Sequence, residues 1–404
     1  MLVGRRYRLE LSPEQAAYAE RVAGSCRAVW NAGLEQRRAA AQQRSSRRPT
    51  YASQCRELAE AKASEPWLAE APSHCLQQTL RDLDRACRQH GVWRVHWRSK
   101  RRSVPSFRFP DAGQIGRPRR LNRRWGEVRL PKLGLVRFRW SRPIGGTIRH
   151  ATVLRDGQHW SVAFCVEDGR AEPAPNGLPP IGIDRGVAVP VATSDGQCLG
   201  LEAIRPGEAS RLRRLQQRLA RQTQGSSRRR RTVRAIGRLQ RRVRNRRADF
   251  AHQTAHRLTT AHGLVVVEDL RVRAMTASAR GTREQPGTNV RQKAGLNRSI
   301  LDRAWGQLRT VLEWHGRKHG CQVVAVPAAY TSQTCSACGY LAADNRESQA
   351  VFCCRACGVV EHADINAARV ILAAGLAVTA RGDLGGARSM KREPPDREVA
   401  RAAD

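Results

Sequence analysis

The chain has 404 residues, enough for two or three domains, and its 40% hydrophobic content is too high for a largely disordered protein. Its charge is strongly unbalanced, because 73 Lys and Arg residues stand against 35 Asp and Glu residues and give a formal net charge of +38. Self-repulsion at this charge destabilises a compact chain unless a polyanion neutralises it, as nucleic acid does through phosphate contacts. A GC-rich genome would explain the choice of arginine but not the excess over acids. We therefore expect a nucleic-acid-binding protein.

The N-terminal residues MLVGRRYRLELSPEQ lack the apolar core of a signal peptide. No stretch approaches the length of a membrane-spanning helix, which needs about 20 apolar residues. We therefore expect a cytoplasmic protein with no membrane partner. The sequence has 12 cysteines, and in a reducing compartment cysteines in close pairs are expected to bind metal rather than form disulfides.

The N-terminal half is predicted to begin with a strand and helices and to continue as short strands. Residues 2–11 form a predicted strand. A helix is predicted to follow, because Ser12 suits its N-cap and Pro13 its first turn. A second helical pattern covers residues 72–89. Predicted strands then cover 106–109, 128–130, 135–140, 151–154 and 160–166. Arginines alternate with aromatic residues here, which indicates a small barrel that touches nucleic acid, or simply a buried aromatic face and a solvated basic face.

The C-terminal half begins after a Pro-rich linker at residues 170–180 and is predicted to start with three strands joined by tight turns. Residues 205–247 hold 17 arginines and one acid, Glu208, with apolar residues at helical spacing and a break at residues 225–227. This pattern predicts two basic amphipathic helices that lie on a larger fold and present their charge to phosphates. The predicted nucleic-acid contacts are Arg228, Arg229, Arg230, Arg231, Arg241, Arg242, Arg246 and Arg247.

Beyond these helices, residues 264–270 predict a buried strand and residues 273–297 a polar, mobile loop. One helix from Ile300 to Leu312, a strand at 321–327 and a final helix at 364–376 follow. A Cys-rich insert precedes the final helix. The tail from Gly382 is low in apolar residues and is predicted to be disordered.

The most specific short motif is a pair of Cys-x2-Cys knuckles. Cys335-Ser-Ala-Cys338-Gly is followed after 15 residues by Cys354-Arg-Ala-Cys357-Gly, the spacing that completes a tetrahedral thiolate site. The glycine after each knuckle suits a turn with positive φ. Four protein ligands leave no open position, so we predict one structural Zn²⁺, with Cys353 as a spare thiol. A thiol redox pair and buried free cysteines are the alternatives.

Three acidic residues form the second candidate site. Asp184 lies in the first strand of the C-terminal half, Glu268 ends the apolar strand LVVVE, and Asp364 opens the final helix. An acid in a buried strand is unfavourable unless a divalent metal compensates its charge. In an RNase H-like fold the first and fourth strands are neighbours, and the closing helix adds a third carboxylate. We therefore predict that the three acids hold two Mg²⁺ ions, although singly Asp364 reads as an N-cap and Glu268 as a solvated strand end.

The motifs GIDRG, VVVEDL, TSQTCSACG, CRACG and ADINAA, in this order, resemble the RuvC-type nuclease and zinc ribbon of TnpB proteins, transposon-associated ancestors of compact type V CRISPR effectors. Similar segments in the N-terminal half are Val29-Trp30-Asn31, LQQTLRDLDRA, PSFRFP, LPKLG and ATVLRDGQHWSVAF. The resemblance covers about residues 1–378. It implies that Asp184, Glu268 and Asp364 are the Mg²⁺-binding catalytic acids. The sequence matches the family pattern at these three positions and at the four zinc cysteines.

The resemblance implies a multidomain α+β fold: a split β-barrel (wedge) with a helical recognition lobe, followed by an RNase H-like (RuvC) α/β domain with an inserted zinc ribbon. The expected barrel consists of residues 1–11 and 93–172, with the recognition lobe at 12–92 between them. After a linker at 173–180, the nuclease domain covers 181–330, with Arg-rich helices at 205–258, and resumes at 362–380. The ribbon is expected at 331–361 and the disordered tail at 381–404.

The function implied is an Mg²⁺-dependent DNA endonuclease that binds a guide RNA and recognises a short flanking motif and a complementary double-stranded DNA target. A chain of 404 residues is small for a heteroduplex of about 20 base pairs, so we expect a monomer or homodimer on a large structured RNA. Two other hypotheses stay open: a guide-independent RNase H-fold resolvase or transposase, and an RNA-guided DNA binder without cleavage.

Overall fold

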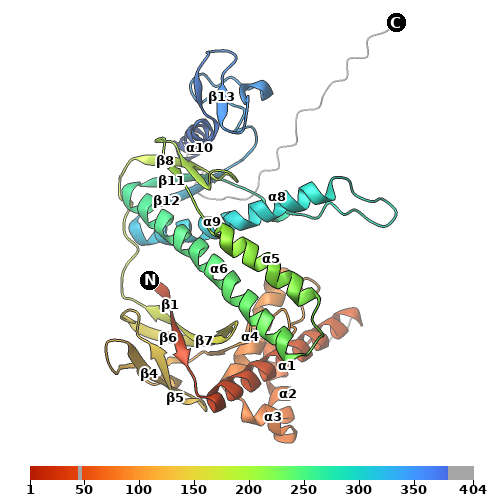
Figure 1. The fold of residues 1–404 in the computed structure, drawn as a ribbon. Coiled ribbons are helices and arrows are strands. Elements are labelled where there is room, and N and C mark those ends of the chain that lie inside the picture. Colours follow the sequence, from red (N-terminus) through yellow and green to blue (C-terminus); the bar gives the residue numbers. More distant parts are fainter. Residues whose placement is uncertain (44–47, 381–404) are drawn as a thin grey trace. The chain divides into compact units, whose positions relative to one another are not determined.

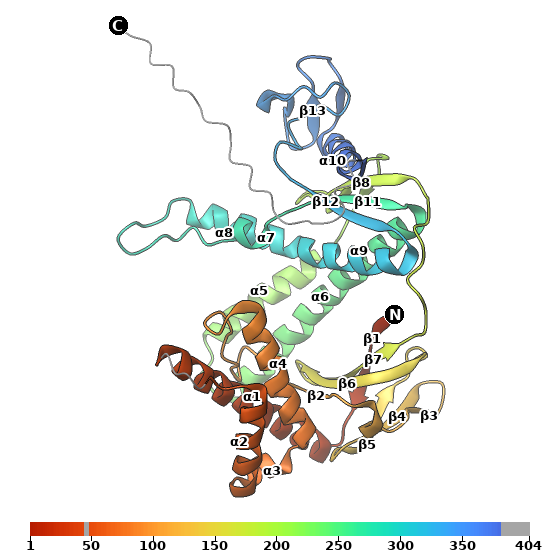
Figure 2. The ribbon, with the colours of Figure 1, turned by 180° about the vertical axis from the view of Figure 1, so that it is seen from behind.

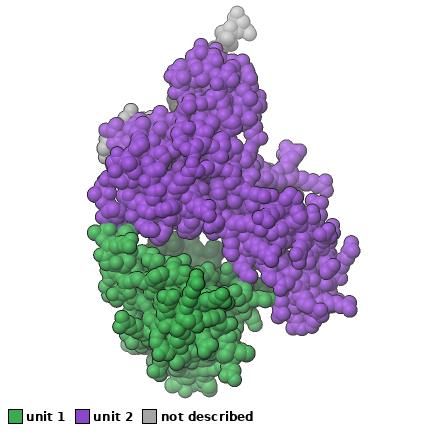
Figure 3. All heavy atoms as spheres, turned by 60° about the vertical axis from the view of Figure 1, so that its left-hand side comes forward, with its two compact units in different colours: residues 1–171 green, residues 172–404 purple. Residues whose placement is uncertain are grey.

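The structure is a computed structural model that describes residues 1–43 and 48–380 (Figures 1 and 2). The chain folds as two compact units, residues 1–171 and 172–404, drawn in different colours in Figure 3. The tail that was predicted to be disordered lies outside the described residues.

Unit 1 contains a seven-stranded antiparallel sheet in the order β2-β6-β7-β1-β5-β4-β3. Its strands are β1 (Leu2–Glu10), β2 (Ser106–Phe109), β3 (Arg119–Arg120), β4 (Trp125–Leu130), β5 (Gly134–Arg139), β6 (Thr147–Asp156) and β7 (His159–Glu167). Strand β1 joins the two halves, because most of its length pairs with β7 while Leu9 and Glu10 pair with β5. Strands β2 and β3 remain edges within the described residues, so the pairing does not establish the predicted barrel, which stays a prediction.

Four helices are inserted between β1 and β2: α1 (Pro13–Gln42), α2 (Tyr51–Ser64), α3 (Pro66–Glu70) and α4 (Ser73–His90). The predicted start of α1 is confirmed, since Ser12 caps the helix and Gln15 completes a capping box. Helices α2 and α3 were not predicted. Their apolar pattern is sparse, because among their apolar side chains only Leu58 and Leu68 are buried.

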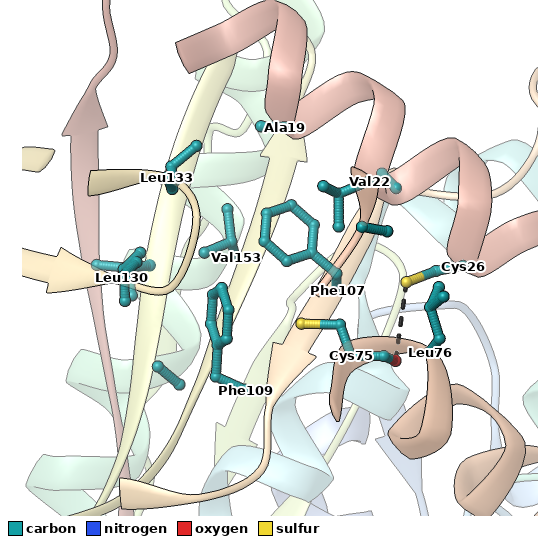
Figure 4. Packing of buried hydrophobic residues seen from close by; sticks show 14 of the residues in the cluster. Ala19, Val22, Cys26, Cys75, Leu76, Phe107, Phe109, Leu130, Leu133 and Val153 are labelled. Atoms are coloured by element: carbon teal, nitrogen blue, oxygen red, sulfur yellow. Dashed lines mark hydrogen bonds between the residues drawn. The ribbon is translucent and has the colours of Figure 1, made fainter. Parts of the chain in front are cut away.

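Helices α1 and α4 pack on the sheet of unit 1 through one shared hydrophobic core (Figure 4). In this core Phe107 and Phe109 of β2 lie near Val22 of α1 and Val153 of β6, and the Cys26 thiol donates to the Cys75 carbonyl oxygen. Among the aromatic residues of the alternating segments, Phe107, Phe109 and Phe138 are therefore buried and Trp140 is half-buried. This confirms the second interpretation of the alternation, a buried aromatic face behind a basic one.

Unit 2 contains a five-stranded sheet in the order β10-β9-β8-β11-β12. Its strands are β8 (Pro180–Asp184), β9 (Val191–Thr193), β10 (Cys198–Leu199), β11 (Leu264–Glu268) and β12 (Gln322–Val326). The first three form an antiparallel meander, and β8, β11 and β12 run parallel to one another. The predicted side-by-side placement of the first and fourth strands is confirmed by the pairing of β8 with β11.

The helices of unit 2 are α5 (Pro206–Ala220), α6 (Ser227–Ala261), α7 (Val272–Met275), α8 (Val290–Arg303), α9 (Trp305–His319) and α10 (Ala363–Ala380). Alternation along the strands sends Ile181, Ile183, Val265 and Val267 into a core with α6 and α9. Val266 points the other way and packs with α10. The sheet therefore has α6 and α9 on one face and α10 on the other.

Three sequence-based predictions for unit 2 are wrong in part. The predicted loop at 273–297 contains most of α7 and the first half of α8, and the predicted single helix breaks at Ala304, where φ is 54°. The expectation that no segment could cross a membrane fails for α10, which is long and apolar enough by length and composition. This helix nevertheless packs against the sheet of unit 2 and carries buried Asp364.

Candidate functional site

The first site is built where β8 and β11 end beneath α10. Ile183 pairs with Val267, so the next residues, Asp184 and Glu268, lie at the same edge of the sheet. Because side chains alternate, both acids point to the face opposite Ile183 and Val267, the face that α10 covers. Asp364 lies in the first turn of α10. Three acids far apart in the sequence are thereby brought to one corner of unit 2.

Two glycines let α10 approach the sheet closely. A Cβ atom on Gly182 of β8 would clash with the backbone oxygen of Ala368, and one on Gly375 of α10 would clash with Val266. The absence of these side chains seats α10 directly on β8 and β11. The start of α10, with Asp364, is therefore held over the ends of both strands.

The three carboxylates line one cavity of about 990 Å³. Glu268 and Asp364 are 7% and 6% exposed. Within the described residues the three acids do not bring one oxygen each within 4.8 Å of the other two. The site is thus an open cavity walled by acids rather than a closed ligand shell.

Electrostatics identify Asp184 as the central acid. Burial raises its pKa to about 7, and the negative charges of Glu268 and Asp364 add to the shift. Burial also raises the pKa of Glu268, opposed by the Thr331 hydroxyl and the charge of Arg185. The negative charges of both other acids therefore act on Asp184, and a cation bound in the cavity would offset this repulsion.

Arg185 supports this corner and was not singled out from the sequence. It is only 3% exposed, and its guanidinium donates to the backbone oxygens of Glu268 and of Trp305, the latter at 3.2 Å. The Trp305 indole in turn donates to the Gly186 oxygen at 3.3 Å. These bonds connect the ends of β8 and β11 with the start of α9. Arg185 therefore fixes the strand ends that carry the acids.

Two further residues touch the acids directly. The Thr331 hydroxyl donates to Glu268 Oε1 at 2.5 Å, and the Arg346 guanidinium donates to Asp364 Oδ1 at 3.4 Å. Both lie in the segment between β12 and α10, and both line the cavity. Neither was predicted, because their roles depend on how that segment folds back over the sheet.

The second site is the cysteine cluster. One sulfur each from Cys335, Cys338, Cys354 and Cys357 lies within 4.8 Å of the others, with Sγ–Sγ distances of 3.7 Å for Cys335–Cys357 and 3.6 Å for Cys338–Cys354. Tetrahedral Zn–S bonds of about 2.3 Å place the sulfurs about 3.8 Å apart, so the cluster fits zinc. A backbone N–H of Cys357 is the main cause that lowers the pKa of Cys354 to about 6.

The predicted knuckle geometry is confirmed. Gly339 and Gly358 have φ of 76° and 71°, the left-handed region expected after each knuckle. All 12 cysteines lie in the described residues and are free thiols. Cys353 lies in strand β13 (Val351–Cys353), which pairs with β14 (Val360–His362), outside the cluster.

Two buried asparagines connect the cysteine knuckles to the acidic site. Asn366 of α10 accepts from the Ser336 amide at 2.9 Å and donates to the Thr334 oxygen at 2.8 Å. Asn345 donates to the Gln333 oxygen at 2.9 Å and directly precedes Arg346. Neither asparagine is exposed. The fold of the knuckles therefore determines where Arg346 meets Asp364.

The eight arginines predicted to contact nucleic acid all lie on α6. Arg228, Arg230, Arg231 and Arg242 are exposed. Three others have internal partners: Arg229 donates to the Leu219 and Gln222 oxygens, Arg246 pairs with Glu208, and Arg247 pairs with Asp302. The helix pair thus uses part of its charge to hold α5 and α8, while the exposed arginines stay predicted contacts.

Comparisons with known proteins cover most of the chain. Residues 163–279 match a family model described as "Probable transposase" (OrfB_IS605) and residues 305–371 one described as "Cas12f1-like, TNB domain". A relative from Escherichia coli K12, "Putative RNA-guided DNA endonuclease InsQ", is 36% identical over 97% of both chains. A second, "Putative RNA-guided DNA endonuclease" from Streptomyces pristinaespiralis, is 32% identical over 96% of this chain and 95% of that one. The chain belongs to the TnpB family.

Two further matches bear on the fold of this TnpB family member. The solved structure "Cryo-EM structure of the Cas12f1-sgRNA-target DNA complex" aligns with a TM-score of 0.54 over 89% of this chain and 83% of that chain, at 12% identity. That likeness concerns the fold alone. Residues 1–46 match a model described as "Helix-turn-helix domain". Of these residues the structure describes 1–43, which form β1 and the single long helix α1.

Proposed function

We propose that this TnpB family member is an RNA-guided DNA endonuclease whose catalytic acids are Asp184, Glu268 and Asp364. The observation that carries the proposal is the convergence of these acids on one cavity. Family membership and the names of the full-length relatives support it. Strand order and helix placement in unit 2 suit the RNase H-like, RuvC-type domain that the sequence predicts.

The donor set fits Mg²⁺, since carboxylate oxygens are its preferred protein ligands and Asp184 is electrostatically coupled to both neighbours. Two bound Mg²⁺ ions would supply an activated water and stabilisation of the leaving oxygen of a DNA phosphodiester. Asp184, as the central acid, would be the shared ligand, with Glu268 and Asp364 on either side. Thr331 would hold Glu268 in one orientation, and Arg346 would offset part of the charge of Asp364.

Guide RNA and target DNA would be held by the basic surfaces. The exposed arginines at the start of α6 (Arg228, Arg230 and Arg231) would bind phosphates, while base pairing with the guide supplies sequence choice. The four cysteines would bind one structural Zn²⁺ and so hold Arg346 and the start of α10 in their positions beside the cavity. A cytoplasmic or nucleoid location suits both the free thiols and a DNA substrate.

The test is purification of the chain with its bound RNA, sequencing of that RNA, and incubation with DNA that matches it beside a randomised flanking sequence. We expect cleavage that requires Mg²⁺, the RNA and a particular flank. Unchanged cutting after the RNA is removed would replace the proposal with a guide-independent resolvase. Tight target binding without cleavage in Mg²⁺ would replace it with an RNA-guided binder.

A further inference from the structure

A group of histidines outside the acidic and cysteine sites has the geometry of a metal site. His256 on α6 and His315 and His319 on α9 each offer a ring nitrogen, and these three nitrogens lie within 4.8 Å of one another. His315 and His319 are four residues apart, so they share one face of α9. That face packs against α6 in the core of unit 2. Three imidazoles from two helices thus converge on one point.

The protonation of His319 is set by its neighbour Thr259. The Thr259 hydroxyl has one hydrogen, which it donates to the Ala255 carbonyl oxygen at 2.7 Å. The His319 Nδ1 atom lies 2.8 Å from the same hydroxyl, whose oxygen can therefore only accept. Nδ1 thus carries the proton, and Nε2 keeps its lone pair. A hydrogen bond from the second ring nitrogen is the usual support for a metal-binding histidine.

His315 supplies an independent indication. It is 7% exposed, its Nε2 lies 3.2 Å from His252 Nδ1, and its Nδ1 is buried without a hydrogen-bond partner. A buried polar nitrogen without a partner is unfavourable by about 1–3 kcal/mol unless something satisfies it. Burial, with the nearby charges of His252 and His319 next, lowers the pKa of His315 to about 4, so the ring is neutral at pH 7.

The position of the cluster separates it from the acidic site. His319 ends α9 just before β12 begins, so it lies near the edge of the sheet at which β11 and β12 start. Glu268 and Val326 are the last residues of these two parallel strands, so the acidic site lies at the opposite edge of the sheet. His256 is exposed, which leaves a route for an ion from solvent. An ion held here would connect α6 with α9 rather than take part in cleavage.

We propose that His256, His315 and His319 form a binding site for a divalent transition metal, with Zn²⁺ or Ni²⁺ as the matching ions. Neutral imidazole nitrogens suit these ions, whereas Mg²⁺ prefers oxygen. The site would hold the C-terminal half of α6 to the end of α9. This inference does not depend on the proposed nuclease function.

The test uses the full-length, tag-free chain with its bound RNA, dialysed against ZnCl₂ and then against metal-free buffer, with zinc per chain measured by mass spectrometry. We expect two zinc ions in the native chain and one in His319→Gln, because the cysteine cluster keeps its own. His90→Gln, which removes an exposed histidine at the end of α4, is the matched control and should keep two. One zinc in the native chain, or two in His319→Gln, would overturn the proposal.

Two finer variants test the ligand geometry by titration with NiCl₂. Thr259→Val keeps the side-chain shape but removes the acceptor for His319 Nδ1, and should weaken Ni²⁺ binding by about 10- to 100-fold. Lys318→Gln removes a positive charge that acts on both His315 and His319, and should tighten binding. Ni²⁺ affinities that match the native chain in both variants would mean that the ion binds elsewhere.

Discussion

The acidic site and the cysteine site of unit 2 are assembled in opposite ways. The four cysteines come from two local knuckles and place their sulfurs within 4.8 Å of one another. The three acids come from β8, β11 and α10, and they surround a cavity of about 990 Å³. A closed ligand set serves structure, whereas an open one leaves room for substrate and water. The contrast predicts that damage to the first site acts on the fold and damage to the second acts on chemistry.

The largest expected effect is on cleavage, from Asp184→Ala. Removal of the central acid should lower the cleavage rate by more than about 1,000-fold, because a barrier increase of about 4 kcal/mol is expected when shared metal ligands are lost. Guide RNA binding, measured by filter retention, should stay unchanged because phosphate contacts are untouched. Asp249→Ala, which removes an exposed acid on α6, is the control and should cleave normally. Loss of RNA binding in Asp184→Ala would contradict the role assigned to this acid.

Cys354→Ser should produce the opposite pattern, a structural failure first. Loss of one thiolate should release the zinc and unfold the two knuckles, since binding free energy at such sites is folding free energy. Cleavage should then fall as well, because Arg346, which donates to Asp364, directly follows Asn345, which is held within the folded knuckles by its bond to the Gln333 oxygen. Zinc content and limited proteolysis measure the first effect. Cys353→Ser changes the adjacent cysteine, which lies outside the cluster, and should leave zinc content and protease resistance unaltered. Zinc retained by Cys354→Ser would contradict the ligand set.

The same contrast explains what the sequence could predict. The cysteine ligands follow from local spacing, and Asp184 and Glu268 stand out because acids are rare in strands that are otherwise apolar. Strand alternation and parallel pairing then place these two acids together without further information. The four cysteines, Asp184 and Glu268 are therefore accessible to reasoning from local pattern, as is the meander that starts unit 2.

Residues that act only through tertiary contacts were not predictable. Arg185 reads as a basic residue after an acid, and only the fold shows that it binds the backbone of Glu268 and Trp305. Asn345 and Asn366 look like ordinary turn and helix residues. Helix α8 lies in a polar stretch and buries only Ile300, so its sequence carries almost no apolar periodicity. Each miss reflects a role that depends on partners far away in the chain.

A third prediction concerns pH and stability at the acidic site. The folded pKa of Asp184 is about 7 against 3.8 for an ordinary Asp, so in the window between these values the folded chain binds more protons than the unfolded one. Stability should therefore fall as pH rises through this window, by at most roughly 4 kcal/mol. Asp184→Asn cannot ionise, and in Mg²⁺-free buffer it should be more stable than the native chain at pH 8, with the difference vanishing near pH 4.

Urea unfolding of both chains at pH 5 and pH 8 measures this effect. Asp249→Asn provides the control, since its exposed carboxyl should give no pH-dependent difference from the native chain. A constant offset between Asp184→Asn and the native chain at both pH values would mean that neither burial nor the charges of Glu268 and Asp364 raise the pKa of Asp184. The cavity would then lack the concentrated negative charge that the metal proposal requires.

The smallest expected effect comes from Arg346, the residue where the two sites meet. Its guanidinium lies 3.4 Å from Asp364, and its side chain is 30% exposed, so solvent screens part of the interaction. Arg346→Gln should therefore lower cleavage by only about 10- to 100-fold, or about 1.4–2.8 kcal/mol of barrier, with zinc content unchanged. Arg355→Gln removes a neighbouring arginine that pairs with Asp344 and Glu347 instead, and should cleave normally. Equal losses in both variants would mean that Arg346 acts through general charge, whereas a specific loss would show that the cysteine knuckles position a group for the acids.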